Sequence, residues 1–229
     1  MRLSRKAGVA SVTYLAAGLL WVFVAHPPGS ALALVAWLVA VACIGCFVPG
    51  EANQVSLARA YLAAPGFAYA SQVDDAGILA LVVALAGLTD LVDGTVARRF
   101  AHPSTLGGGL DPVVDGLFMG AVVSGLVASG VIPAWLAAVV VGRYLLPALA
   151  GALLIGLHRR PELRHTLMGQ VSTSLILILV GGVALFRGLK QDPGPLVTAA
   201  ELVIPIATAA TFVHLAWVAR RPAQPPEGA

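Results

Sequence analysis

Eight long apolar runs, separated by short breaks, constrain the fold of this chain more than any other feature. Most runs approach the length of roughly 20 residues that a helix needs to cross a bilayer. Hydrophobic residues make up 59% of the 229 and charged residues only 11%, which is unlike a water-soluble domain. The sequence therefore predicts an all-α, polytopic transmembrane bundle of about eight helices. The runs cover residues 9–25, 30–48, 55–69, 78–91, 117–128, 134–157, 171–186 and 196–218.

The positions of Lys and Arg predict how the bundle sits in the membrane, because short cytoplasmic loops are rich in both residues. Arg2, Arg5 and Lys6 precede the first run, and most other cations fall on the same side when the loops are counted alternately; Arg187 and Lys190 do not. We therefore expect a multi-pass protein of the cell membrane with both termini in the cytoplasm. The net charge of +3 reflects this bias. No basic cluster with interleaved aromatic residues indicates nucleic-acid binding.

Four aspartates stand in or beside two of the apolar runs. Asp90 and Asp93 are three residues apart and Asp111 and Asp115 are four apart, so each pair shares one face of a helix. The link between the pairs is short, which predicts antiparallel neighbouring helices. A carboxylate in a transmembrane segment costs about 2.5–3.5 kcal/mol, so this cluster requires cations. Four hard oxygen donors suit Mg²⁺ or Mn²⁺ and can hold two such ions.

The residues between the acids indicate a ligand that carries phosphate. Gly94 and Ala97 leave the helix face beside the acids almost bare, so a bulky group can approach the backbone closely. Arg98 adds a planar cation that suits phosphate. A metal-bridged pyrophosphate flanked by arginine is a common electrostatic arrangement in phosphoryl transfer.

These residues form the pattern Asp90-x2-Asp93-Gly94-x2-Ala97-Arg98-x8-Gly107-x3-Asp111-x3-Asp115. It resembles, at all eight positions, the signature of the CDP-alcohol phosphotransferase (CDP-alcohol phosphatidyltransferase) family. Upstream, Asn53-x2-Ser56-x2-Arg59 is similar to the Asn-x2-Thr-x2-Arg that opens the first core helix of many members, with Ser here in place of Thr.

The resemblance implies a six-helix core over residues 53–218. Residues 1–52 would then be an extra N-terminal pair of transmembrane helices, which we expect to pack on the core or on a second copy. Residues 219–229 would be a disordered cytoplasmic tail. Because members of this family are often homodimers, the resemblance also implies a homodimer in the lipid bilayer, with its active site at the cytoplasmic side.

The same resemblance implies a reaction. A CDP-linked lipid, usually CDP-diacylglycerol, donates its phosphatidyl group to the hydroxyl of a polar alcohol, and CMP leaves. The four aspartates would hold two Mg²⁺ or Mn²⁺ ions, with Asp115 also taking the proton of the acceptor hydroxyl as the catalytic base. The residues implied to bind the CDP-lipid are Asn53, Ser56, Arg59, Gly94, Ala97, Arg98 and Gly107.

The acceptor site is less closely matched. Residues 169–173 resemble the Gly-Lys-x-Lys-Thr of relatives that use phosphorylated glycerol, but Gln170 and Ser172 stand where those relatives have lysine. Arg143 lies in an apolar run, where it either extends to the membrane surface or, as the resemblance implies, faces the acceptor. We assign an acceptor site to Arg143, Arg159, Arg160, Arg164 and Gln170.

These cations favour a phosphorylated acceptor, such as glycerol phosphate or inositol phosphate, over a neutral polyol or an amino alcohol. The roughly two negative charges of a phosphate group need fixed cations nearby. Two other classes of protein stay open. A divalent-cation transporter also uses intramembrane carboxylates, but it leaves Gly94, Ala97 and Arg98 unexplained. A catalytically inactive scaffold is disfavoured because all eight signature positions are intact.

Overall fold

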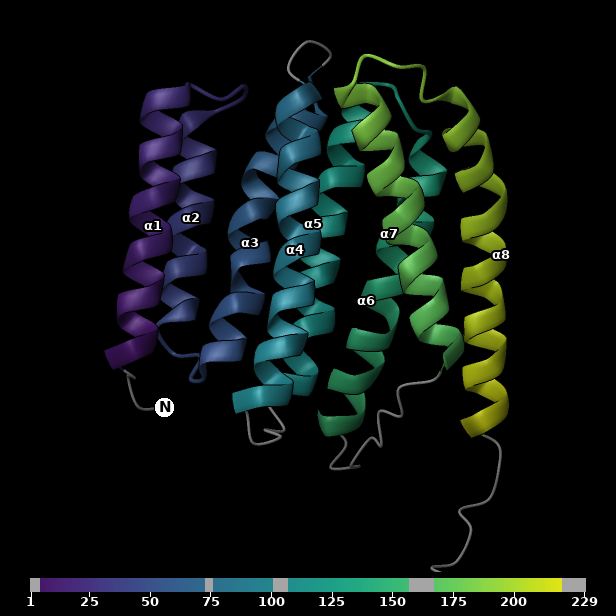
Figure 1. Ribbon diagram of the computed structural model, residues 1–229. Coiled ribbons are helices and arrows are strands. Elements are labelled where there is room, and N and C mark those ends of the chain that lie inside the picture. The colour runs from purple at the N-terminus through teal and green to yellow at the C-terminus, as the bar shows by residue number, and fades with distance from the viewer. Residues whose placement is uncertain (1–4, 73–75, 101–106, 157–166, 220–229) are drawn as a thin grey trace, which may run out of the picture.

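The computed structural model describes residues 5–72, 76–100, 107–156 and 167–219, and this part of the chain folds into eight helices without a strand (Figure 1). The predicted all-α class and the number of helices are confirmed. The helices are α1 (Arg5–Ala25), α2 (Ala31–Gly45), α3 (Glu51–Ala70), α4 (Ala76–Phe100), α5 (Gly107–Ala128), α6 (Ala134–Gly156), α7 (Leu167–Gly188) and α8 (Gly194–Ala219).

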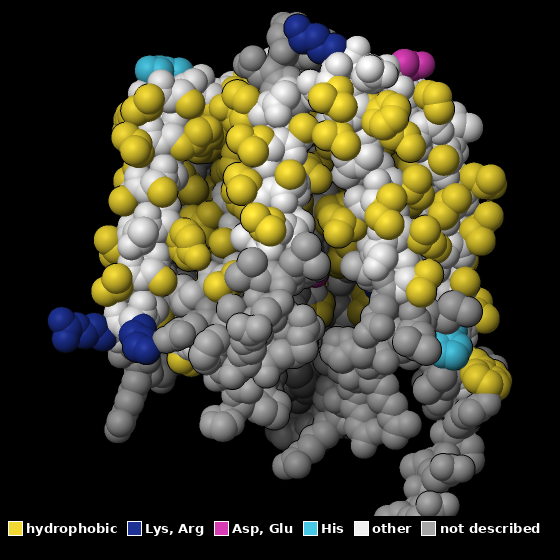
Figure 2. Space-filling model, in the orientation of Figure 1, with side chains coloured by type: hydrophobic (Ala, Val, Ile, Leu, Met, Phe, Trp, Pro, Cys, Tyr) yellow, Lys and Arg dark blue, Asp and Glu magenta, His cyan; other side chains and the backbone are white. Residues whose placement is uncertain are grey.

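The helices have the lengths and the apolar surface of a multi-pass membrane protein. Three described segments are long and apolar enough to cross a membrane, namely Arg5–Ala25, Val171–Gly188 and Gly194–Trp217. Shorter apolar helices are Ala31–Gly45, Gly77–Thr89, Pro112–Ala128 and Ala134–Pro147. On the face of the bundle that Figure 2 shows, hydrophobic side chains are spread over the described surface between the two ends, and some hydrophobic side chains, such as Leu32 and Val213, are largely exposed. This surface fits contact with lipid.

Six of the helices pack in a closed ring. Each contacts the next in the order α3, α4, α7, α8, α6 and α5, and α5 contacts α3 again. In Figure 1, α4 and α7 lie in front, α5 and α6 behind them, and α1 and α2 stand outside the ring beside α3. The end of the bundle that holds the end of α4 and the start of α5 is called the site end here. The other end holds the α7–α8 connection.

An apolar core fills the ring away from the site end. The buried side chains come from the beginnings of α4, α6 and α8 and from the ends of α5 and α7, which meet at that end because helices consecutive in the chain alternate in direction. They include Leu79, Val82, Val123, Leu126, Leu136, Val140, Val180, Val183 and Ala200. The interior of this half of the ring is therefore largely apolar in the described residues.

Helices α3 and α5 approach each other closely. A Cβ atom at Gly125 would lie 2.6 Å from the Cβ of Ala70 and 2.7 Å from the carbonyl oxygen of Phe67, so only glycine fits there. Small residues allow such close packing between membrane helices. The contact fixes how α5 slides along α3, and this register places the polar residues described below.

The N-terminal pair α1–α2 is attached to α3 by polar contacts of aromatic side chains. Trp37 Nε1 donates to the carbonyl oxygen of Ala60 over 2.9 Å, and Trp21 Nε1 donates to the hydroxyl of Tyr69 over 3.2 Å. Packing on the core is therefore one role of this helix pair.

Arg187, an exception to the predicted charge bias, has a structural role at the end opposite the site. Its side chain is buried and donates to the carbonyl oxygen of Ala70, to the hydroxyl of Ser129 and to the carbonyl oxygen of Gln72. The carbonyls at a helix C-terminus have no partner within their own helix. Arg187 therefore caps α3 and ties it to the end of α5.

Candidate active site

The signature residues lie on the helices that flank α3. Asp90, Asp93, Gly94, Ala97 and Arg98 occupy the last part of α4, whereas Gly107, Asp111 and Asp115 occupy the first part of α5. The structure describes the side chain of Asp115; those of Asp90, Asp93, Arg98 and Asp111 lie outside the described side chains, and these positions are known from the helix backbone. Among the side chains that the structure describes, no three His, Cys, Asp or Glu residues come together.

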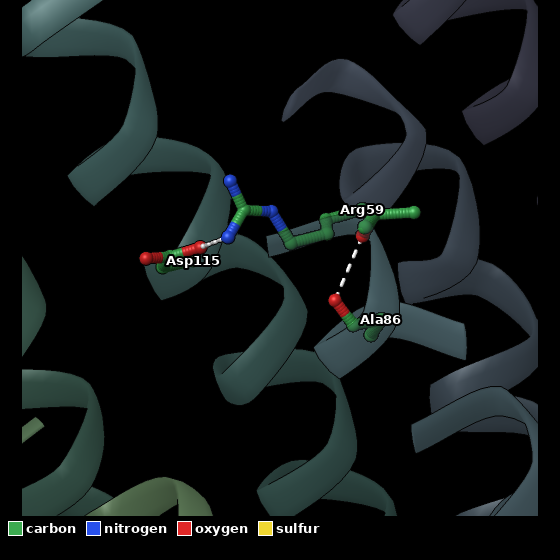
Figure 3. A network of polar contacts seen from close by, with 4 residues as sticks. Arg59, Ala86 and Asp115 are labelled. Carbon is green, nitrogen blue, oxygen red and sulfur yellow. Dashed lines mark hydrogen bonds and ion pairs between the residues drawn. The ribbon is translucent and has the colours of Figure 1, made fainter. Parts of the chain in front are cut away.

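An ion pair joins α3 to α5 inside the ring. Arg59 Nη1 lies 2.7 Å from Asp115 Oδ1, and the two side chains point toward each other across the gap between their helices (Figure 3). The Arg59 side chain is 4% exposed and the Asp115 side chain 26%. The carboxylate therefore keeps an open side while the guanidinium is enclosed. The pair connects the upstream Asn-Ser-Arg residues to the signature.

Asn53 and Ser56 share the face of α3 that carries Arg59, because the three residues are spaced by three along a helix. Both are buried. Asn53 Nδ2 donates to the carbonyl oxygen of Pro49 over 2.6 Å, so this amide also holds the segment that enters α3. The structure thus brings Asn53, Ser56, Arg59 and Asp115 together at the site end.

Two of the four aspartates, Asp90 and Asp111, lie at similar depths in the bundle. Ser56 lies as many residues before the end of α3 as Asp90 lies after the start of α4. The two helices are antiparallel and rise by the same amount per residue, so the backbones of Ser56 and Asp90 lie about level. Helices α3 and α5 are parallel. The contact of Arg59 with Asp115 and that of Ala70 with Gly125 give nearly the same difference in residue number between facing positions of the two helices. This difference puts the backbones of Ser56 and Asp111 about level. Asp90 and Asp111 therefore flank α3 at one depth.

Arg143, which sequence analysis assigns to the acceptor, is buried between helices. It is 9% exposed, and its Nη2 atom lies 3.2 Å from the carbonyl oxygen of Gly169 and 3.5 Å from the hydroxyl of Thr173. The side chain therefore joins α6 to the first turns of α7. Of the other acceptor residues, Arg159, Arg160 and Arg164 lie outside the described residues, and Gln170 is placed in α7 without a described side chain.

The ring contains polar residues that sequence analysis did not assign to the site. Gln54 Nε2 donates to the carbonyl oxygens of Gly45 and Val48 over 3.0 and 2.7 Å, which fixes the connection from α2. Ser172 and Thr208 are buried on α7 and α8. Ser172 lies four residues before the apolar Ile176, and Thr208 lies four residues after the apolar Ile204. This spacing was the signal in the sequence that could have placed both hydroxyls on the inner helix faces.

The comparisons with known proteins agree with this arrangement. The sequence model of the CDP-alcohol phosphatidyltransferase family matches residues 51–217, from the start of α3 into the last turn of α8. The chain belongs to the CDP-alcohol phosphatidyltransferase family. The match includes all six helices of the ring and leaves the α1–α2 pair outside it. No solved structure matches the chain.

Individual relatives are similar over part of their length. A probable cardiolipin synthase (CMP-forming) of Drosophila melanogaster is 32% identical over 145 residues, which cover 56% of this chain and 45% of that protein. The cardiolipin synthase (CMP-forming) of Streptomyces coelicolor is 34% identical over 96 residues, 41% of this chain and 43% of the relative. An archaetidylinositol phosphate synthase of Methanothermobacter thermautotrophicus is 33% identical over 90 residues, 37% and 46% respectively. The matched part thus spans about half of each relative.

The Arg59–Asp115 ion pair predicts a distinctive pattern of stability in this phosphatidyltransferase-family chain. Arg59→Gln and Asp115→Asn each remove this enclosed contact between opposite charges, so each should lower the free energy of unfolding in detergent by about 3 kcal/mol. The double variant should recover part of that loss because neither charge remains. Additive losses in the double variant would show that the two side chains do not interact.

Proposed function

We propose that the chain transfers a phosphatidyl group from CDP-diacylglycerol, or a related CDP-lipid, to the hydroxyl of a polar alcohol that carries phosphate, with release of CMP. The observation that supports this most is the Arg59–Asp115 pair, because it puts a carboxylate with an open side beside the helix segments that hold the family signature. The reaction serves phospholipid biosynthesis. The core that performs it would cover residues 53–218, preceded by the extra pair 1–52 and followed by the tail 219–229.

The proposed site uses two divalent ions, Mg²⁺ or Mn²⁺, held by Asp90, Asp93, Asp111 and Asp115. The donor set fits such ions, since hard cations prefer carboxylate oxygens. The common depth of the Asp90 and Asp111 backbones supports the fit. One buried guanidinium beside Asp115 offsets one of four negative charges, and the four positive charges of two dications would exceed the remaining three by one. When bound, the ions would neutralise charge on the pyrophosphate of the CDP-lipid.

The residues of the chain would carry out the transfer as follows. Asp115 accepts the proton of the acceptor hydroxyl, and Arg59 orients its carboxylate. The hydroxyl oxygen forms a bond to the phosphorus of the phosphatidyl group. The bond from that phosphorus to the bridging oxygen breaks, and CMP leaves with the electron pair. Asn53, Ser56, Arg59, Gly94, Ala97, Arg98 and Gly107 would line the CDP-lipid site.

Release of CMP tests this proposal directly. Purified protein with CDP-diacylglycerol and Mg²⁺ should release CMP when given an alcohol from a panel of glycerol phosphate, inositol phosphate, phosphatidylglycerol, inositol and serine. Asp90→Asn, Asp93→Asn and Asp111→Asn should each lower the rate by several orders of magnitude. Asp115→Asn should abolish turnover but keep binding of the CDP-lipid nearer to normal. Passage of Mg²⁺ across liposomes by a protein that releases no CMP would instead favour the transporter.

The acceptor is proposed to carry phosphate. Its site would combine Arg143 with Arg159, Arg160, Arg164 and Gln170. The three relatives described above are named for two products with phosphate in the alcohol-derived part: cardiolipin, in which glycerol joins two phosphatidyl groups, and archaetidylinositol phosphate. Arg143 supports the same class of acceptor, because it is a buried cation within the ring and fixed guanidinium groups bind phosphate oxygens.

Competition by an inorganic anion tests the acceptor class. Phosphate or sulfate should inhibit CMP release, and the inhibition should weaken as the acceptor concentration rises. Arg143→Ala should raise the acceptor KM at least tenfold with little change in the KM of the CDP-lipid, and Arg143→Lys should restore part of the affinity because it keeps the charge. If neither anion nor variant has an effect, the acceptor is an uncharged alcohol.

We also propose that the protein lies in the cell membrane with both termini and the active site on the cytoplasmic side, as the distribution of Lys and Arg indicates. In a variant with Cys43 and Cys46 replaced by serine, a cysteine at Pro49, at the site end, should react with a membrane-impermeant thiol reagent from the cytoplasm only. A cysteine at Gln191, at the other end, should react from outside only. The reverse labelling would refute this orientation. A homodimer is also proposed, and light scattering in detergent measures its mass.

A further inference from the structure

The inner faces of α7 and α8 change from apolar to polar toward the site end. On α7, buried Val183, Val180 and Ile176 are followed at the same spacing by Ser172, which is 2% exposed. On α8, Ala200 and Ile204 are followed by Thr208, which is 7% exposed. Because residues four apart on a helix share a face, Ser172 and Thr208 continue the faces that line the interior of the ring.

Three buried polar atoms on this side of the ring lack partners. Within the described residues, Ser172 Oγ, Thr208 Oγ1 and Arg143 Nε have no hydrogen bond. An unsatisfied buried hydroxyl or guanidinium N–H costs free energy comparable to a lost hydrogen bond, and no lipid chain can replace that bond. Thr211, one turn further along α8, differs because its hydroxyl donates to the carbonyl oxygen of Ala207 in its own helix over 2.8 Å.

The three groups come from neighbouring positions. A Cβ atom at Gly182 would lie 3.3 Å from Leu196 Cδ1, and counting along antiparallel α7 and α8 from this contact puts Ser172 and Thr208 within one turn of the same depth. Arg143 reaches the same turn of α7, since its Nη2 atom contacts the hydroxyl of Thr173. Helix α6 also packs directly against α8.

This group of residues adjoins the proposed catalytic base. A Cβ atom at Gly116, the residue after Asp115, would lie 2.9 Å from the Cβ of Tyr144, the residue after Arg143. Helices α5 and α6 therefore touch where they carry Asp115 and Arg143. A molecule whose reacting hydroxyl lies at Asp115 can therefore reach the side of the ring formed by α6, α7 and α8.

We propose that Ser172, Thr208 and Arg143 form a subsite that binds a non-reacting hydroxyl group of the acceptor alcohol. This inference rests on the proposed function, because it needs an acceptor at Asp115. Each Ser or Thr hydroxyl both donates and accepts hydrogen bonds, and Nε of Arg143 adds a donor. The two neutral hydroxyls of Ser172 and Thr208 bind a metal ion poorly and cannot neutralise a charged group of the ligand. The acceptor group that suits them is therefore another hydroxyl. The subsite makes the enzyme select polyols over alcohols with a single hydroxyl.

The experiment compares an acceptor with an analogue that lacks one non-reacting hydroxyl. The pair is glycerol phosphate with 3-hydroxypropyl phosphate, or phosphatidylglycerol with phosphatidyl-1,3-propanediol if the lipid is the better acceptor. CMP release gives kcat/KM for both members in the wild type, Ser172→Ala, Thr208→Val and the control Thr211→Val. Thr211 is a matched control because its hydroxyl is buried but already bonded.

The wild type and Thr211→Val should prefer the polyol by roughly three- to tenfold, as expected for one hydrogen bond. Ser172→Ala and Thr208→Val should lose this preference, with a higher KM for the polyol, an unchanged KM for the CDP-lipid and an unchanged or higher thermal midpoint. A stable Thr208→Val and Ser172→Ala that both keep the wild-type preference would overturn the subsite. Failure of the wild type to release CMP with any acceptor would instead overturn the proposed function, and the subsite with it.

Discussion

Charge within a membrane-spanning bundle must be balanced inside the bundle, and the Arg59–Asp115 pair shows how this chain begins to meet that requirement. Arg59 is enclosed and Asp115 is partly open, with 2.7 Å between their charged atoms. Burying either group alone in hydrocarbon is costly. The pair therefore requires α3 and α5 to pack at one register, and the glycine contact at the far end of the same two helices enforces that register.

The two ends of the ring have separate tasks. Away from the site, apolar side chains from α4 to α8 fill the interior, and Arg187 caps α3. This packed half holds the helices rigidly, so that polar groups at the other end keep fixed positions. A site supported in this way can bind a charged headgroup at one end of the bundle while the acyl chains of a lipid substrate remain in the bilayer. The α1–α2 pair adds support from outside by its contacts with α3.

Much of this architecture could be predicted from the sequence, because apolar runs report lipid-facing and buried helices directly. The apolar runs at 78–91 and 117–128 are shorter than α4 and α5, because the segments that carry the charged signature residues belong to the same helices. These segments extend α4 to Phe100 and start α5 at Gly107. The ion pair of Arg59 could not be predicted, because α3 packing against α5 brings together residues far apart in the chain. Thr208 was missed because its spacing of four from Ile204 places it on the inner face of α8 only once the burial of Ile204 is known.

The central claim is that the aspartates of α4 and α5 form one divalent-metal site within the ring. Electron paramagnetic resonance of Mn²⁺ titrated into the purified protein measures this without turnover. The account predicts saturable binding that tightens when CDP is added and weakens strongly in Asp90→Asn and Asp111→Asn, while Asp192→Asn, at the opposite end, binds as the wild type does. Equal Mn²⁺ binding in all four proteins would contradict it.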